Sequence, residues 1–208
     1  DYKYGKTRLL DPAVTNFPRL ESVITESTYG AKTDVLPPRV EAEGKLIELI
    51  NKTLSRGGKV LIPELGLGRA QETMMILEDA IKTGKMENIP VYIDGMIWDI
   101  NAIHTAYPDF LSNSLKSLTF ADKNPFTSEV FSRVGSPQER KKVIEGGPCV
   151  VLATSGMLTG GASVEYLREF ASSSKNSLIF VCYQGSGSLG RQIQDGLKET
   201  RMIVEGRE

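Results

Sequence analysis

Histidine is almost absent from this 208-residue sequence, which contains only His104. Zinc hydrolases hold their metals with several histidine or carboxylate ligands, and serine hydrolases need a histidine base. One histidine cannot build a two-metal hydrolase site or a Ser-His-Asp triad within this chain. No Walker-type phosphate-binding motif is present either. The chain by itself therefore predicts an anion-binding scaffold without a reactive centre.

Cysteine is also scarce, and positive charge is not in excess. The two cysteines, Cys149 and Cys182, lie in apolar runs and predict small core residues rather than a disulfide framework. A reducing, cytoplasmic location follows as an expectation. The net charge is −1, so any contact with RNA must come from a local arrangement of basic groups.

Long hydrophobic runs are missing as well. The longest runs are far shorter than the roughly 20 residues of a membrane helix, so no membrane partner is expected. No signal peptide opens the chain. Because the chain begins at Asp1 without a methionine, we expect it to be an excised part of a longer protein.

Short apolar runs alternate with helical patterns along most of the chain. The runs are rich in Val, Ile and Leu, as is typical of strands buried on both faces. The alternation predicts an α/β fold, with a mostly parallel, Rossmann-like sheet and helices on both faces. The expected strands are residues 23–25, 60–62, 91–93, 149–153 and 178–183.

Apolar residues at helical spacing predict helices over residues 46–54, 70–81 and 100–110. Ser136 opens a capping box with proline at the first helical position, and further helices are expected over residues 163–171 and from Leu189. The stretch 113–135 is the least regular and is interpreted as a long loop or a surface flap. Residues 1–22 are interpreted as an edge strand and a crossing segment.

The segments that follow the expected strands carry the polar chemistry. In an open parallel sheet, ligands bind beyond the carboxyl ends of the strands. Each of these segments contains glycine, and most contain hydroxyl or charged residues. The topology therefore predicts that they meet on one rim, formed by residues 26–30, 63–69, 94–95, 154–161 and 184–191.

Two of these segments end in Gly-Arg at the start of a helix, at Arg69 and Arg191. Helix N-termini present free N–H groups to anions, and a guanidinium adds a bidentate fork for phosphate. The pattern therefore favours a site for a phosphate-bearing ligand. The alternative is that the glycines only shape tight turns while the arginines pair with surface acids.

Two single residues are candidates for chemistry. Glu26 ends the first expected strand, where a carboxylate could orient a metal ligand or take part in acid–base catalysis. A turn or helix cap is an equally open interpretation of Glu26. His104 lies on the apolar stripe of its helix, which favours a half-buried core histidine over a catalytic one.

Five motifs, in order, resemble the β-CASP domain of the metallo-β-lactamase superfamily. The resemblance covers nearly the whole chain and is greatest to archaeal homologues of the cleavage and polyadenylation specificity factor endonuclease subunit. The motifs are Glu-Ser-Thr-Tyr-Gly at 26–30, Gly-Leu-Gly-Arg-Ala-Gln-Glu at 66–72, Asn-Pro-Phe at 124–126, Ala-Thr-Ser-Gly-Met-Leu-Thr-Gly-Gly at 153–161 and Gly-Ser-Gly-Ser-Leu-Gly-Arg at 185–191.

The resemblance implies a two-domain parent enzyme that cleaves RNA. Its metallo-β-lactamase domain would carry two zinc ions, and the β-CASP domain would be a lid inserted within it. By the same resemblance, Asp1 matches the metal-bridging aspartate and Glu26 matches the acidic first β-CASP motif. Residues 1–22 would then belong to the metallo-β-lactamase domain and residues 23–208 to the β-CASP domain. The family's other metal-ligating histidine motifs are missing from this chain, so the isolated chain should not cleave RNA.

The expected function is therefore that of an RNA-guiding domain of a zinc-dependent endoribonuclease for mRNA 3′-end processing or transcription termination. Arg69 and Arg191 would bind phosphates, and loop hydroxyls and N–H groups would add donors; those donors are Ser155, Gly156, Ser186 and Ser188. The expected partners are RNA and the metallo-β-lactamase domain, and a homodimeric parent is left open. The alternatives are a free-standing Rossmann-like module for a nucleotide or another phosphate-bearing ligand, and a pure interaction domain.

Overall fold

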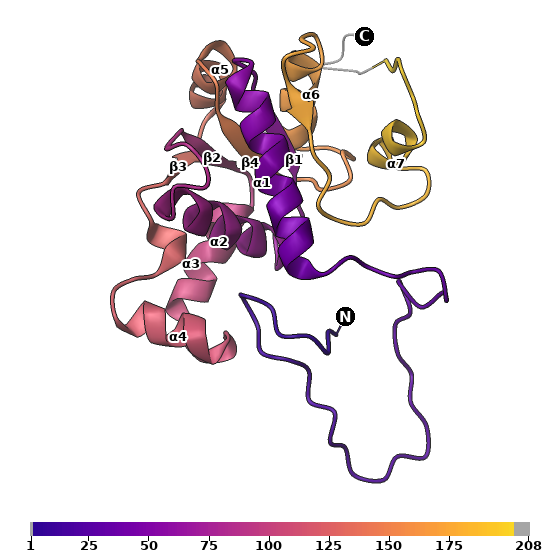
Figure 1. Cartoon of the computed structure of the whole chain (residues 1–208). Coiled ribbons are helices and arrows are strands. Elements are labelled where there is room, and N and C mark those ends of the chain that lie inside the picture. Colours follow the sequence, from indigo (N-terminus) through magenta and orange to yellow (C-terminus); the bar gives the residue numbers. More distant parts are fainter. Residues whose placement is uncertain (1, 202–208) are drawn as a thin grey trace.

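A parallel sheet forms the centre of the computed structural model, which describes residues 2–201 (Figure 1). Within these residues the strand order is β3-β2-β4-β1-β5, and every neighbouring pair is parallel. The strands are β1 (Val60–Pro63), β2 (Val91–Asp94), β3 (Phe131–Val134), β4 (Val150–Ala153) and β5 (Ser177–Leu178). The prediction of a mostly parallel α/β sheet is confirmed.

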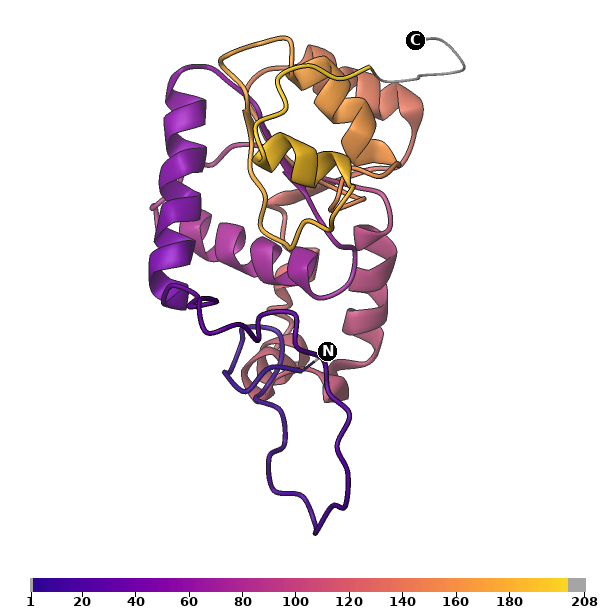
Figure 2. The same cartoon turned by 90° about the vertical axis from the view of Figure 1, so that its right-hand side faces the viewer.

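Helices cover both faces of this sheet, so the layering is also as predicted. Figure 2 shows α1 and α6 on opposite sides of the strands. The helices are α1 (Arg39–Ser55), α2 (Arg69–Lys82), α3 (Ile97–Ala106), α4 (Asn113–Phe120), α5 (Pro137–Glu145), α6 (Ala162–Phe170) and α7 (Leu189–Gln194), with the 3-10 turns η1 (Pro108–Phe110) and η2 (Pro125–Thr127).

Alternation along the central strands divides the core into two layers. Val150 and Leu152 of β4 face the layer formed with α1, α2 and α3. Val151 and Ala153 face the layer formed with α5 and α6. Successive side chains of a strand point to opposite faces, so a strand with apolar residues at every position is buried on both sides. This is why the continuous runs predicted these strands well.

The segment 113–135 is not a long loop or a flap, and that interpretation was wrong. It contains α4, η2 and the edge strand β3. Ser112 caps α4, because its hydroxyl accepts the N–H of Leu115. Phe126 of η2 is buried in the core against the α2 side. Only Phe131 and Val134 of β3 are buried, while Ser132 and Arg133 are exposed, so β3 lacks the continuous apolar run of a central strand.

The expectations for the N-terminal region and for the last strand also need correction. Residues 23–25 are fully exposed and form no strand, and no edge strand occurs within residues 2–22. The segment before α1 instead leaves the body as an open excursion (Figures 1 and 2). In the region 178–183, only Leu178 belongs to β5, although the Ile179 N–H still donates to the Leu61 carbonyl at 2.9 Å.

The stripe predicted along residues 100–110 is mostly exposed. Ile103, Tyr107 and Phe110 face solvent, and the buried face of α3 consists of Ile97 and Asn101 instead. His104 is half-buried, as expected, with Nδ1 2.8 Å from the carbonyl oxygen of Ile100 and its ring edge-to-face with Phe126.

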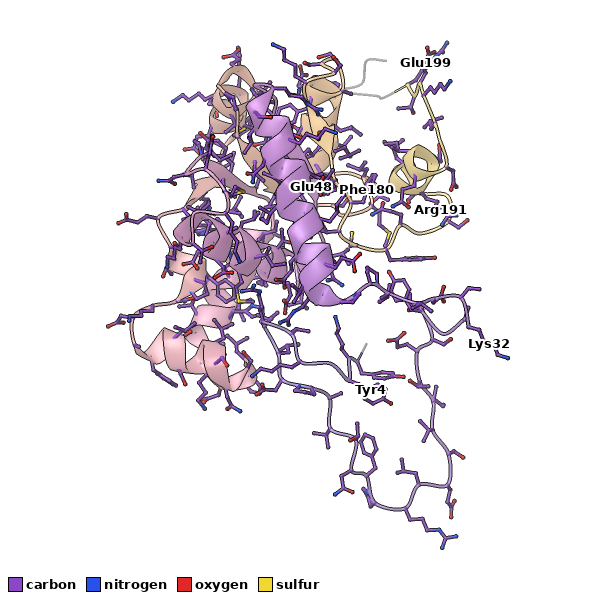
Figure 3. All side chains as sticks on the ribbon, viewed as in Figure 1. Tyr4, Lys32, Glu48, Phe180, Arg191 and Glu199 are labelled. Atoms are coloured by element: carbon purple, nitrogen blue, oxygen red, sulfur yellow. The ribbon has the colours of Figure 1, made fainter. Side chains whose placement is uncertain are left out.

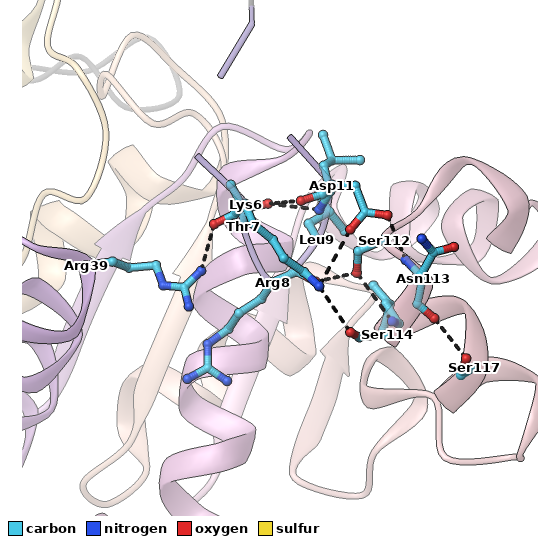
Figure 4. A network of polar contacts seen from close by, with 12 residues as sticks. Lys6, Thr7, Arg8, Leu9, Asp11, Arg39, Ser112, Asn113, Ser114 and Ser117 are labelled. Carbon is cyan, nitrogen blue, oxygen red and sulfur yellow. Dashed lines mark hydrogen bonds and ion pairs between the residues drawn. The ribbon is translucent and has the colours of Figure 1, made fainter. Parts of the chain in front are cut away.

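A short stretch before the excursion is held firmly on the helical body (Figure 4). Glu72 of α2 accepts the backbone N–H groups of Arg8 and Leu9 at 3.2 and 2.7 Å. The Arg8 guanidinium pairs with Glu43 of α1, and the hydroxyl of Ser112 donates to the Arg8 carbonyl at 2.9 Å. Leu9 is buried in the core. This stretch therefore joins α1, α2 and the start of α4.

Among the described helices, none is long and apolar enough to cross a membrane.

Candidate functional site

The loops that follow β1, β4 and β5 meet at the carboxyl edge of the sheet, as the topology predicts, whereas the segment 26–30 follows no described strand and lies in the exposed N-terminal excursion. Gln184 Nε2 donates to the Gly156 carbonyl at 2.9 Å, and the Gly190 N–H donates to the Met157 carbonyl at 3.2 Å. A Cβ atom added at Gly66 would lie 3.5 Å from Thr154 Cγ2. The loops after β1, β4 and β5 therefore form one continuous surface, which we call the rim: residues 64–69, 154–161 and 184–191.

Glu64 begins the first rim segment and is completely buried. Neither of its carboxylate oxygens has a hydrogen-bond partner among the described residues. Burial raises the pKa of Glu64 to about 8, and the nearby Thr73 and the charge of Arg69 only partly oppose that shift. Below pH 8 the favoured form of Glu64 is therefore the neutral acid, because an unpaired carboxylate is costly in an apolar interior.

Cys182 and Gln184 line the same buried region. The Cys182 thiol lies 3.5 Å from the Gly156 carbonyl oxygen, and burial together with the nearby Glu64 raises the pKa of this thiol to about 11. Cys182 is thus an inert thiol near neutral pH rather than a nucleophile. Gln184 uses its amide nitrogen for Gly156, while its buried Oε1 has no partner among residues 2–201.

The side chain of Gln71 fixes the loop that leads into α2. Its Oε1 accepts the Gly68 N–H at 2.7 Å, and its Nε2 donates to the Gly66 carbonyl at 3.0 Å and to Asn101 Oδ1 at 2.9 Å. The Arg69 N–H donates to the Leu67 carbonyl at 3.1 Å. Because these N–H groups are already used, anion binding here would depend on the guanidinium of Arg69. That side chain is exposed and makes no ion pair within the described part of the chain.

Arg191 is placed differently, although its sequence context is similar. Its guanidinium pairs with Asp195 one turn later at 3.0 Å, and this contact raises its pKa. Ser188 caps α7: its hydroxyl accepts the Arg191 N–H at 3.2 Å and donates to the Gly185 carbonyl at 2.8 Å. Ser186 is exposed. The alternative that these arginines pair with acids on the surface therefore describes Arg191 better than Arg69.

Ser155 and Gly156 shape the rim from within. The Ser155 hydroxyl accepts the Thr159 N–H at 2.9 Å and lies 3.1 Å from the Gly160 carbonyl oxygen. A Cβ atom added at Gly156 would lie 2.8 Å from the backbone nitrogen of Leu65, so this glycine permits the close approach of two loops. Their contribution to ligand binding stays a prediction.

Glu26 lies in the exposed N-terminal excursion. Its carboxylate accepts the Thr28 N–H at 2.9 Å, and this hydrogen bond lowers its pKa. The contact is that of a turn cap, and the catalytic role suggested for Glu26 stays a prediction. Asp1, predicted as a metal ligand, lies outside the described residues.

The residues that the structure describes do not form a zinc site. Within residues 2–201 no group of three His, Cys, Asp or Glu residues is arranged to hold a metal ion. His104 has one ring nitrogen on a main-chain carbonyl and packs on Phe126. The two zinc ions implied by the resemblance would need ligands from outside this region.

A buried ionic network at the end of β2 was not predicted from the sequence. Arg140 of α5 donates to both oxygens of Asp94 at 2.8 and 3.0 Å, and Tyr166 OH donates to Asp94 at 3.0 Å. Arg140 also pairs with Glu165. The network connects α5 and α6 to β2. An acidic residue directly after an apolar strand is the signal that could have drawn attention to both Asp94 and Glu64.

The fold and the rim define a doubly wound α/β domain with a polar, glycine-rich carboxyl edge, a class that places ligands at this edge. The family model described as the Beta-Casp domain matches residues 70–193. This match covers more than half of the chain, and the chain belongs to the Beta-Casp family.

The curated relatives include archaeal proteins called transcription termination factor FttA. The protein from Methanocaldococcus jannaschii is 58% identical over 206 residues, which are 98% of this chain and 32% of the relative. The protein from Thermococcus kodakarensis is 52% identical over 207 residues, covering 99% of this chain and 32% of the relative. The protein from Lokiarchaeum sp. is 53% identical over 204 residues, which are 98% of this chain and 32% of the relative. The chain thus spans about a third of the length of these relatives.

Proposed function

We propose that this chain guides RNA within a longer parent protein that acts in transcription termination. The proposal is supported by the name shared by its relatives, transcription termination factor, and by the rim of the β-CASP domain. The single observation that carries it is Arg69, an exposed guanidinium without an ion pair among the described residues, at the carboxyl edge of the sheet. Such a group suits a backbone phosphate of RNA.

The parent is proposed to be a zinc-dependent endoribonuclease in which this domain is a lid. The residues described here supply no metal cluster, so the cleaving centre would belong to the rest of the parent. The open excursion over residues 14–36 exposes Phe17, Ile24 and Leu36, and such apolar surface suits packing against another part of the parent. The role of this chain would be to bind and orient the RNA strand.

The test is RNA binding by the full-length parent, measured by fluorescence anisotropy with a labelled single-stranded RNA at several salt concentrations. Replacing Arg69 with alanine should weaken binding by roughly 10–150-fold, since a hydrogen bond to a charged group contributes about 1.5–3 kcal/mol. The slope of log affinity against log salt should fall by about 0.7 per lost phosphate contact. Lys141→Ala is the matched control, because it removes one positive charge from an exposed position on α5, where Lys141 pairs with Glu145.

Arg191 offers an internal comparison. Because Asp195 already engages its guanidinium, Arg191→Ala should weaken RNA binding less than Arg69→Ala. Asp195→Ala should strengthen binding, since it frees Arg191 and removes a negative charge from the rim. Unchanged affinity and an unchanged salt slope in both arginine variants would refute the proposed role of the rim.

A further inference from the structure

Two tyrosines from opposite ends of the chain meet beside the rim. Tyr29 belongs to the N-terminal excursion, and Tyr183 immediately precedes the last rim segment. Their ring centroids are 6.3 Å apart, and the ring planes are nearly perpendicular, at 88°. Figure 3 shows Lys32, three residues after Tyr29, and Arg191 on the same side of the molecule. The pair connects residues that are more than 150 positions apart in sequence.

The pair is not part of the hydrophobic core. Tyr29 is 51% exposed and Tyr183 is 47% exposed, and neither belongs to the two buried clusters. Every residue from 14 to 40 is exposed, so Tyr29 belongs to no buried cluster within its own segment. An aromatic pair that only stabilised the fold would be expected to bury more of its surface.

The edge-to-face geometry leaves aromatic faces open. In such a pair the edge of one ring covers one face of the other, so one ring keeps both faces free of its partner and the other keeps one. A planar group can therefore stack on either ring without separating them. Unpaired nucleobases are planar and stack on aromatic side chains in proteins that bind single strands, whatever their sequence.

A basic group, paired with Asp195, lies near these faces. Tyr183 is close enough to Arg191 to contribute, after Asp195, to the raised pKa of that guanidinium. The exposed Ser186 lies three residues after Tyr183. Proteins that follow a single strand combine aromatic faces for the bases with positive charge for the backbone. The same two components occur here within one surface.

We propose that Tyr29 and Tyr183 form a stacking subsite for one unpaired base of a single-stranded RNA. This inference rests on the proposed function, which assigns RNA to the rim, and adds a contact that recognises the base rather than the phosphate. The subsite also gives the N-terminal excursion a role, since Tyr29 adds its aromatic face to the subsite only when that segment lies against the rim.

The experiment uses the full-length parent and a set of single-stranded RNAs, each with one abasic nucleotide at a successive position. Base stacking on an aromatic side chain is worth about 1–3 kcal/mol, so Tyr183→Ala should weaken binding of the intact RNA about 5–150-fold. Tyr29→Ala should also weaken binding. Tyr29 lies in an open segment, so its substitution should not unfold the rest of the domain. Tyr183→Phe should bind normally, because stacking does not need the hydroxyl.

The abasic set separates stacking from a general loss of structure. At one position, removal of the base should weaken binding to the wild type and erase the difference between wild type and Tyr183→Ala. Tyr107→Ala is the control, since Tyr107 is also an exposed tyrosine, 61% accessible, at the end of α3. The salt slope should be the same in all tyrosine variants, because no charge is removed.

The outcomes separate this inference from the proposed function. If Arg69→Ala weakens binding but both tyrosine→alanine variants bind like wild type, the stacking subsite is wrong and the proposed function stands. If Tyr183→Ala lowers the affinity by the same factor on every abasic RNA, the tyrosines act only through packing, for instance against another part of the parent. The subsite is then also refuted. If the wild type shows no salt-dependent RNA binding, both proposals fail.

Discussion

The buried carboxyl group of Glu64 should make the stability of the fold depend on pH. The side chain is fully buried without a hydrogen-bond partner among the described residues, and its pKa is raised from 4.5 to about 8. Glu64→Gln keeps the shape of the side chain and removes its ionisation. The comparison of wild type with Glu64→Gln therefore isolates the cost of charging this buried site.

The sign and size follow from proton linkage. Between pH 4.5 and 8 the folded chain keeps the Glu64 proton while the unfolded chain has lost it, so unfolding releases a proton and stability falls as pH rises. Below pH 4.5 there is no penalty from Glu64, and above about pH 8 the penalty is constant. One pKa unit corresponds to 1.36 kcal/mol, so the full penalty is about 5 kcal/mol, and at pH 7 it is about 3 kcal/mol. These values are upper limits, because a buried carboxylate can rearrange or admit water.

The assay is urea unfolding of both proteins at pH steps from 4.5 to 8.5, with the free energy of unfolding obtained by linear extrapolation. Glu64→Gln should match the wild type near pH 4.5 and exceed it increasingly toward pH 8. Glu48→Gln, an exposed residue of α1 that pairs with Lys45, should show little change across the range. A stability difference between Glu64→Gln and wild type that stays constant with pH would mean that Glu64 is already charged in the fold, and the reasoning would be wrong.

Two further substitutions test contacts that hold the site in place. Arg140→Ala leaves Asp94 buried without its bidentate partner, so the free energy of unfolding should fall by about 3–5 kcal/mol; a loss below about 1 kcal/mol in urea unfolding would contradict this. Glu72→Ala frees the N–H groups of Arg8 and Leu9, so these two amides should exchange hydrogen faster, while the amides of β4 keep their protection. Unchanged exchange at both residues would show that the burial of Leu9 alone holds this stretch.

The central strands could be predicted from sequence because their signal is local. The runs at 60–62 and 91–93 each begin and end with a β-branched residue and have a leucine or a tyrosine between them, and each occurs as a strand with one further residue at its end. The edges of the sheet could not be predicted in this way. β3 has two exposed residues, and β5 pairs over only two positions. A short apolar run such as 23–25 joins a sheet only if a strand from elsewhere in the chain lies beside it. Here no described strand lies beside the run, and Ile24 is fully exposed.

The candidate site could likewise be predicted only in part. The meeting of the rim segments followed from parallel topology alone, because every strand in such a sheet ends at the same edge. The burial and the partners of each side chain could not be predicted from topology. Arg69 and Arg191 have similar sequence contexts, but Asp195 lies one helical turn from Arg191 only. Glu64 could be seen to follow a strand, but its burial depends on Gly156 and Cys182, which come from loops about 90 and 120 residues later.

Burial of Glu64 has a consequence for the charge of the rim. If Glu64 were ionised, its carboxylate would attract the nearby guanidinium of Arg69 and offset its charge, since charges interact strongly in the low dielectric of a protein interior. Because burial favours the neutral acid below about pH 8, the charge of Arg69 stays available to an external anion. Arg191, by contrast, forms an ion pair with the exposed Asp195. The rim thus has one arginine without an ion pair among the described residues, Arg69, and one that pairs with a surface carboxylate, Arg191, and the first is better suited to hold a phosphate.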